Sequence, residues 1–172
     1  RYDEAYAAFY KAIWSYAWQA PGYYALAEID GLRSDWAAAL DHVGRSLQTQ
    51  AMNMKARNLK AAFLRRLGRL TEAAALCCET VALDPLDMMS RNEIVLQSRA
   101  QGKSAAAESQ LAELRALTHV SDPLVEVQNA FDMAYDYANA GLWEEASDVL
   151  SRLDGGAGAA VFPMVLYALG HF

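Results

Sequence analysis

The chain has 172 residues, of which 54% are hydrophobic, and its formal net charge is −6, from 15 basic and 21 acidic residues. This composition excludes a disordered chain, a collagen-like repeat and a disulfide-stapled miniprotein, because the sequence is apolar enough to bury a core and contains two cysteines. The net negative charge also excludes a strongly basic nucleic-acid arm. The sequence has no run of about 18 apolar residues that could span a bilayer, so we expect neither nucleic acid nor a membrane as a partner.

Apolar periodicity and helix-end residues predict an all-α chain of about ten short helices. In chain order, they are expected at residues 3–16, 22–32, 36–47, 53–67, 71–83, 85–100, 104–117, 123–140, 143–153 and 160–171. Gly68, Gly102 and Gly141 each follow a predicted helix, where glycine adopts the left-handed conformation that ends a helix without a Cβ penalty. Asp84 and Pro85 are expected to begin the sixth helix, as its capping residue and its first-turn proline.

A repeating pattern runs through the chain, with a period of about 34 residues. Ala5, Ala39, Ala73 and Ala107 follow one another at this spacing, and Ala146 continues the series after a longer step. The additional residues fall in the loop-like stretch 117–123. Each unit would hold two short amphipathic helices, whose apolar faces can be buried only if neighbouring units stack. The period therefore predicts a solenoid of antiparallel helix pairs.

This pattern resembles the tetratricopeptide repeat (TPR), a helix–turn–helix unit with the same period. Tyr23, Leu26 and Ala27 stand where its consensus has Trp, Leu and Gly, and Ala73 and Cys77 hold its A-x3-F pair. The resemblance implies a right-handed α-solenoid formed by one array over residues 1–172. Its parts are a partial repeat at 1–18, repeats at about 19–52, 53–86, 87–122 and 123–158, and a partial repeat at 159–172. Because both ends fall inside repeats, we expect a fragment of a longer protein.

A narrower resemblance rests on the segments 2–6, 14–18, 23–30, 56–61 and 84–87. They look like the helical repeat region of large bacterial proteins that carry a β-rich domain related to carbohydrate-active enzymes. This resemblance implies an alternative function, in which the chain is an accessory helical region of a bacterial carbohydrate-active enzyme. The catalytic residues would then lie outside residues 1–172.

Basic residues are concentrated between residues 42 and 71, where the sequence has no acidic residue. They are Arg45, Lys55, Arg57, Lys60, Arg65, Arg66 and Arg69. In the TPR family the first helix of each pair lines the concave groove, so the resemblance implies a ligand groove formed by Lys55, Asn58, Arg65, Asn92 and Arg99. Asn amides can bond an extended peptide backbone, and guanidinium groups suit carboxylates.

We therefore predict a protein–protein or intramolecular domain interaction scaffold, whose groove binds an acidic or extended segment. The partner would be a protein, a peptide or another domain of the same chain. A simpler alternative remains open, in which the basic residues pair with acidic side chains of neighbouring helices or face solvent.

Ten of the 18 aromatic residues lie within the first 36 residues. Among them, Tyr6, Tyr10, Trp14 and Trp18 are predicted to form an interdomain aromatic surface, buried against an upstream domain. Aromatic faces of this kind also stack on sugar rings and anchor protein interfaces. Because the hairpin partner of the first helix would lie upstream of Arg1, a homodimer through this truncated N-terminal helix is a second expected partnership.

No group of residues has the spacing of a catalytic or metal site. His42, His119 and His171 lie in different units and are expected to be surface or capping residues. Cys77 and Cys78 are adjacent, and Cys77 is predicted to pack as a small hydrophobic side chain. Free thiols favour the cytoplasm. We expect no catalytic residue, no metal and no cofactor, and we predict that the chain is not an enzyme.

Overall fold

The computed structural model describes residues 1–118 and 123–152, and the regular elements within these ranges are all α-helices. They are α1 (Tyr2–Ala12), α2 (Tyr16–Leu32), α3 (Trp36–Thr49), α4 (Met54–Arg66), α5 (Leu70–Leu83), α6 (Met88–Ala100), α7 (Ser104–Thr118), α8 (Pro123–Asn139) and α9 (Trp143–Ser151). The all-α prediction is therefore confirmed. The helix expected at 160–171 lies outside the described residues.

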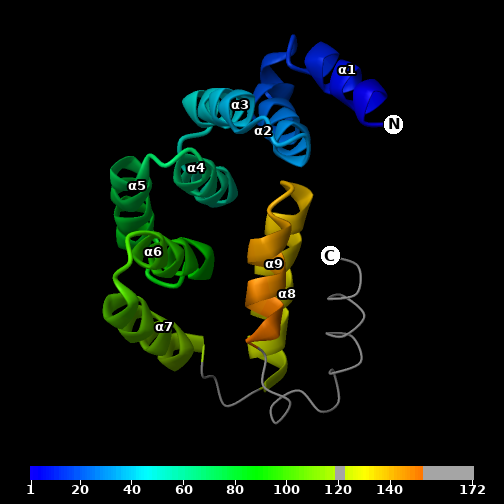
Figure 1. Ribbon diagram of the computed structural model, residues 1–172. Helices are drawn as coiled ribbons and strands as arrows, with labels where there is room; N and C mark the ends of the chain where they lie inside the picture. Colours follow the sequence, from blue (N-terminus) through cyan, green and yellow to red (C-terminus); the bar gives the residue numbers. More distant parts are fainter. Residues whose placement is uncertain (119–122, 153–172) are drawn as a thin grey trace.

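Successive helices pair and stack as the repeat predicts. The pairs are α2 with α3, α4 with α5, α6 with α7, and α8 with α9. As far as α6, the second helix of one pair also packs on the first helix of the next, as α1 contacts α2, α3 contacts α4 and α5 contacts α6. The helices α2 to α7 follow an arc (Figure 1). This arrangement confirms an α-solenoid of helix pairs.

The alanines of the repeating series lie at equivalent buried places. Ala39, Ala73 and Ala146 are 0% exposed and Ala107 is 1% exposed, whereas Ala5 on α1 is half-buried. A side chain as small as alanine lets two helices of a pair approach closely, which explains why the period is most visible at this position.

The helix ends predicted just before Gly68, Gly102 and Gly141 are present. Their φ angles are +74°, +71° and +74°, in the left-handed region that glycine adopts without strain. At the corresponding place after α2 the chain has Ser34, with a φ of +60°. The repeat therefore ends its first helices in the same way in every described unit.

Two predicted boundaries were wrong. Pro21 was expected to lie between helices, but α2 begins at Tyr16 and contains Pro21. The packing of α2 against both α1 and α3 outweighs the one backbone hydrogen bond that the proline removes. Asp84 does not cap the sixth helix: its Oδ1 accepts from the Leu86 N–H at 3.0 Å, within a turn. Asp87 caps α6 instead, since its Oδ1 accepts from the Ser90 N–H at 2.7 Å.

The α8–α9 hairpin leaves the direction of the stack. It folds back onto the inner side of the arc, where α8 lies against α2 and α6 (Figure 1). The approach to α2 is very close, because a Cβ atom added to Gly31 would lie 2.3 Å from the carbonyl oxygen of Ala140. The change of direction falls between α7 and α8, where the step from Ala107 to Ala146 exceeds the regular period.

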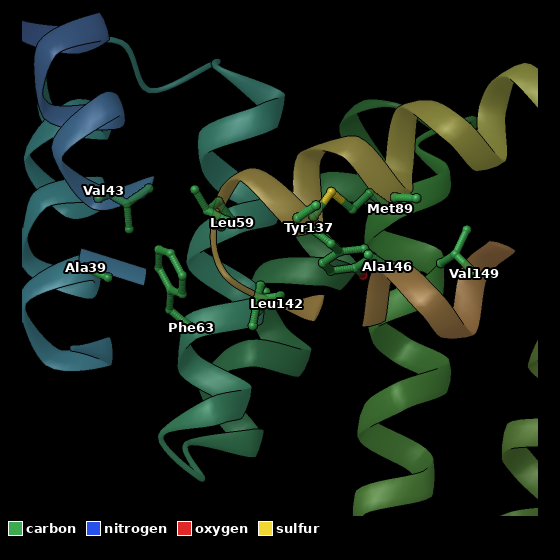
Figure 2. Close-up of a cluster of buried hydrophobic side chains, with 14 of the residues drawn as sticks. Ala39, Val43, Leu59, Phe63, Met89, Tyr137, Leu142, Ala146 and Val149 are labelled. Carbon is green, nitrogen blue, oxygen red and sulfur yellow. The ribbon is translucent and has the colours of Figure 1, made fainter. Parts of the chain in front are cut away.

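The largest hydrophobic core is shared by the stack and this hairpin. Leu59 and Phe63 on α4 pack with Tyr137 on α8 and Leu142 before α9, and each of the four is at most 1% exposed (Figure 2). A smaller core lies between α6 and α7 and contains Val95, Ala107, Leu111 and Leu114. The α8–α9 hairpin is therefore part of the main core of the molecule.

Candidate functional site

The inner surface of the arc, formed by α2, α4 and α6, is called the concave face here, and the α8–α9 hairpin lies on it (Figure 1). The predicted groove residues occur on two of these helices. Lys55, Asn58 and Arg65 belong to α4, and Asn92 and Arg99 belong to α6. Four of the five have polar contacts with the hairpin, whereas Asn58 bonds to the start of α6.

Arg65 is the centre of an ion-pair network between three helices. Its Nε and Nη2 donate to the two carboxylate oxygens of Glu93 on α6, at 2.8 and 3.2 Å. Its Nη2 also donates to Glu145 Oε1 on α9 at 2.7 Å. The Arg65 side chain is 12% exposed and that of Glu93 is 0% exposed. Two buried carboxylates therefore share one buried guanidinium group.

Arg66 adds a second cation at the edge of this network. Its Nη2 donates to Glu145 Oε2 at 2.6 Å and to Glu144 Oε2 at 3.2 Å. Burial acts to raise the pKa of Glu145, but Arg65 and Arg66 outweigh burial and hold that pKa below its usual value. Glu145 is therefore ionised in the folded chain and holds α9 against α4.

Asn92 belongs to a chain of buried hydrogen bonds rather than to an open groove. Its Nδ2 donates to Tyr137 Oη at 3.0 Å, and Tyr137 Oη donates to Glu93 Oε1 at 2.8 Å. Arg152 Nη1 donates to Asn92 Oδ1 at 2.6 Å. Burial and the Glu93 carboxylate raise the pKa of Tyr137, which stays a neutral donor. The polar atoms at the bottom of the concave face are thus bonded to the hairpin.

Lys55 connects the other end of α4 to α8. Its Nζ donates to Asp136 Oδ1 at 2.7 Å. Glu28 on α2 lies near this pair, and burial and Asp136 raise its pKa to about 7, although Lys55 and Tyr24 act in the opposite direction. The sequence could not reveal this pair of acids, because α2 and α8 meet only when the hairpin folds back.

The remaining groove residues have different surroundings. Arg99 Nη1 lies 3.4 Å from Asp148 Oδ2 on α9, and Nη2 lies 3.9 Å from Glu108 on α7. Asn58 Nδ2 donates to Asp87 Oδ2 at 2.9 Å and so fixes the start of α6. Asn58 and Asn92 thus have different partners in the folded chain, the start of α6 for Asn58 and Tyr137 on α8 for Asn92.

Nearly all of the basic segment is neutralised within the molecule. Of its seven basic residues, six have an acidic partner in the described ranges, and Lys60 has no ion pair there. The six pairs are Arg45–Asp41, Lys55–Asp136, Arg57–Glu79, Arg65–Glu93, Arg66–Glu145 and Arg69–Glu72. The simpler alternative, internal ion pairing, is therefore what the structure shows for this segment.

A small hollow of about 240 Å³ lies between α4, α6 and α9. It is lined by Arg65, Arg66, Leu96, Arg99, Glu144, Glu145 and Asp148. Because basic and acidic side chains both line this hollow, this part of the concave face is not purely basic.

The predicted aromatic surface is mostly open. Tyr10, Trp14 and Trp18 are 46%, 86% and 61% exposed, and Tyr6 is half-buried. Tyr6 packs edge-on against the His42 ring with the centroids 6.2 Å apart. These residues lie at one end of the molecule, on α1, on the turn that follows it and at the start of α2. Docking at that end stays a prediction.

His42 was expected to be a surface or capping residue, and this prediction was wrong. The residue is buried, and its Nδ1 lies 2.6 Å from Asp30 Oδ2, which is also buried. Tyr23 stacks on its ring and Tyr10 meets it edge-on. The Asp30 carboxylate on α2 and the His42 ring on α3 can form a hydrogen bond only when these two helices pair. The sequence spacing of the histidines did not indicate this contact.

The described residues, 1–118 and 123–152, show neither a metal-binding cluster nor a membrane-spanning helix. Among them, no group of three or more His, Cys, Asp or Glu side chains is placed to hold a metal ion. Over the same ranges, none of the helices has both the length and the apolar character needed to cross a bilayer.

Comparison with solved structures identifies the architecture. TTC0263, a thermophilic TPR protein of Thermus thermophilus, superimposes with a TM-score of 0.61 at 16% sequence identity, over 99% of this chain and 90% of that protein. YrrB, described as a TPR protein with an unusual peptide-binding site, superimposes with a TM-score of 0.57 at 19% identity, over 97% of this chain and 82% of that protein. The fold is that of the TPR proteins.

At these identities the likeness concerns the fold alone. No protein-family model and no curated protein matches the chain. The TPR resemblance found in the sequence is thus confirmed as a statement about architecture, whereas the narrower resemblance to the repeat region of carbohydrate-active proteins stays a prediction.

Proposed function

We propose that this chain is a protein-interaction scaffold whose concave face holds an acidic helical segment, and that the α8–α9 hairpin is the segment held there. The observation that carries the proposal is the match between basic residues of α4 and acidic residues of the hairpin. Lys55 meets Asp136, and Arg65 and Arg66 meet Glu145, at 2.7, 2.7 and 2.6 Å.

The match has both polar and apolar parts, as specific interfaces do. Around the ion pairs, Tyr137 and Leu142 of the hairpin region are buried against Leu59 and Phe63 of α4. Charge pairs of this kind fix the register and exclude wrong partners more than they add affinity. The similarity to YrrB, which has a peptide-binding site, supports an interaction role in general.

The test cuts the connection between the stack and the hairpin in the folded chain. A specific protease site placed between Thr118 and Pro123 cuts the folded chain, and size-exclusion chromatography and native mass spectrometry then follow whether the two parts stay together. We expect them to stay bound, and we expect Arg65→Ala to raise their dissociation constant by roughly tenfold or more. Arg69→Ala is the matched control, because the one ion pair of Arg69 in the described residues is with Glu72, three residues along the chain, and does not involve the hairpin.

Two results would oppose the proposal. One is separation of the parts as soon as the chain is cut, which would mean that the concave face does not bind the hairpin by itself. The other is an equal effect of Arg65→Ala and Arg69→Ala, which would mean that the buried network does not select the segment.

A second candidate function is favoured by the exposed aromatic residues at the other end. Trp14 and Trp18 could dock this array onto a neighbouring domain, which suits an accessory helical region of a carbohydrate-active enzyme with its catalytic residues elsewhere. The gene sequence upstream of Arg1 distinguishes the candidates. A strand-rich region with paired acidic residues would support this second function, and further repeats of the same period would contradict it.

A further inference from the structure

A hollow of about 630 Å³ lies between α3 and the start of α5, and we call it the outer hollow. It is lined by residues from the ranges 19–23, 40–49, 60–64 and 69–72, and none of its lining residues belongs to the α8–α9 hairpin. The helices α3 and α5 are on the outer side of the arc, whereas the hairpin lies on the concave face (Figure 1). The outer hollow therefore stays open while the hairpin occupies the concave face.

Three basic and two acidic side chains line the outer hollow, and all but one of them are paired with each other. Arg45 Nε donates to Asp41 Oδ2 at 2.8 Å. Arg69 donates from Nε and Nη2 to the two carboxylate oxygens of Glu72, both at 2.7 Å. Lys60 is half-buried and has no ion pair or hydrogen bond with the described residues. Its ammonium group is therefore the charge that is left for a ligand.

The paired charges limit the kind of anion that can bind there. The hydrogen bonds and the charge of Arg69, together with the charge of Lys60, hold the pKa of Glu72 below its usual value, so that this carboxylate stays ionised. The carboxylates of Asp41 and Glu72 repel a polyanion such as nucleic acid. A single carboxylate, in contrast, can pair with Lys60 and leave both arginine pairs intact. The charges thus fit one acidic side chain.

Gly44, in the middle of α3, leaves room beside this charge. A glycine in a helix interior lowers the stability of the helix relative to alanine, yet nothing lies within 4 Å of a Cβ atom placed on Gly44. The repeat does not need a glycine here either, because Tyr10, Cys78 and Ala112 hold the equivalent place in other units. Packing among the described residues therefore gives no reason for this glycine. A helix surface without a side chain lets the backbone of a ligand approach closely.

The outer hollow also carries neutral polar side chains. Gln19, Gln48 and Thr49 line it, and their side chains have no hydrogen bond within residues 1–118 and 123–152. Amide and hydroxyl groups both donate and accept, as the backbone of a bound peptide requires. The hollow thus combines a free ammonium group, a helix surface open to close approach and groups that can bond an extended backbone.

We propose that the outer hollow is a second binding site, which takes an extended segment of a partner protein that carries one acidic side chain. The carboxylate of the segment pairs with Lys60, and its backbone lies over Gly44, where Gln48 and Thr49 bond to it. The proposal does not depend on the concave-face proposal, because no residue that contacts the hairpin by an ion pair lines this hollow. The chain can then hold its own hairpin and a partner at the same time.

A random peptide phage library, panned against the immobilised 172-residue chain, supplies the probe for the test. We expect the enriched peptides to share one Asp or Glu. The strongest binder is synthesised in this form and with the acid replaced by its amide, and fluorescence anisotropy measures both dissociation constants. Lys60→Gln should weaken binding of the acidic peptide by roughly tenfold and leave binding of the amide peptide unchanged.

Gly44→Leu is the second test, because it fills the hollow. It should also weaken binding by roughly tenfold, and it should not lower the midpoint of thermal unfolding, since a helix-interior glycine in open space is replaced by a better helix former. Ala112→Leu, at the equivalent place on α7 and outside the hollow, is its matched control.

The matched control for Lys60→Gln is Lys55→Gln, which removes the same charge from the concave side of α4. Lys55→Gln should weaken the hold on the hairpin and leave peptide binding unchanged, so the two proposals can fail separately. Thermal unfolding of each variant checks that the fold remains. A panning experiment that enriches no peptide, or a peptide whose binding is insensitive to both Lys60→Gln and Gly44→Leu, would overturn the proposal.

Discussion

Gly31 on α2 and Gly141 in the turn between α8 and α9 are in direct backbone contact. A Cβ atom added to Gly141 would lie 2.6 Å from the carbonyl oxygen of Gly31 and 2.8 Å from the Cα of Leu32. The two glycines are far apart in the chain, and they meet because the α8–α9 hairpin folds back onto the concave face.

This contact predicts different costs for two otherwise matched alanine substitutions. Gly68 and Gly141 have the same φ of +74°, but nothing lies within 4 Å of a Cβ atom placed on Gly68. Gly68→Ala should lower the free energy of unfolding by about 1 kcal/mol, from backbone strain alone. Gly141→Ala should cost roughly 2 kcal/mol more, because it also collides with α2. Urea denaturation measures both, and equal costs would mean that the hairpin does not touch α2.

Tyr137→Phe tests the buried polar network. The hydroxyl group donates to Glu93 and accepts from Asn92, and both partners are 0% exposed. Removing it leaves these groups short of a partner, so we expect a loss of about 1–3 kcal/mol in the free energy of unfolding. Tyr135→Phe, on the exposed side of α8, should change it by less than about 0.5 kcal/mol. A Tyr137→Phe variant as stable as the parent would show that the network is not formed.

Glu28→Gln tests the electrostatics where α2 meets α8. Burial and Asp136 raise the pKa of Glu28 from 4.5 to about 7, so between these values the folded chain holds a proton that the unfolded chain has lost. This carboxyl group therefore contributes stability below pH 4.5 that is lost as the pH rises through 7. The Gln variant should match the parent at pH 4 and exceed its free energy of unfolding by roughly 1–3 kcal/mol at pH 8. A parallel pH dependence of the two proteins would contradict the placement of Asp136 near Glu28.

The two thiols should differ in reactivity. Cys77 is buried and Cys78 is exposed. Burial and the Glu93 carboxylate raise the pKa of Cys77 to about 12, which keeps it a thiol at neutral pH. Under native conditions an alkylating reagent should therefore modify one cysteine per chain, and peptide mapping should place it at Cys78. Rapid modification of both thiols in the folded chain would contradict the packing of α5 against α6.

Local structure and the stacking of helix pairs could be predicted from the sequence, because both follow from features that repeat. The alanines at positions 39, 73 and 107 mark the contact within each pair, and the glycines at 68, 102 and 141 mark the end of each first helix. The burial of Cys77 followed from its place in the same pattern and is confirmed.

The position of the α8–α9 hairpin could not be predicted in this way. A repeat defines how a unit packs on its neighbour, but it carries no information about a unit that follows a longer connection and turns onto a distant surface. Arg65 lies on the concave face, yet its partner Glu145 is 80 residues away, and no spacing within a repeat connects the two. A signal was present in the charges, because a chain with 21 acidic and 15 basic residues and one acid-free basic segment has an excess of acidic side chains elsewhere that can pair with it.

The most direct measurement for the central claim is a double-mutant cycle on Arg65 and Glu145, with Arg69 and Glu72 as the control pair. The free energy of unfolding is measured for Arg65→Ala, Glu145→Gln and the double variant, and in the same way for Arg69→Ala and Glu72→Gln. If α9 is held on the concave face by the buried pair, its coupling energy should exceed about 1.5 kcal/mol, against less than about 0.5 kcal/mol for the exposed pair. A coupling energy for Arg65 and Glu145 no larger than that of the control pair would contradict the account.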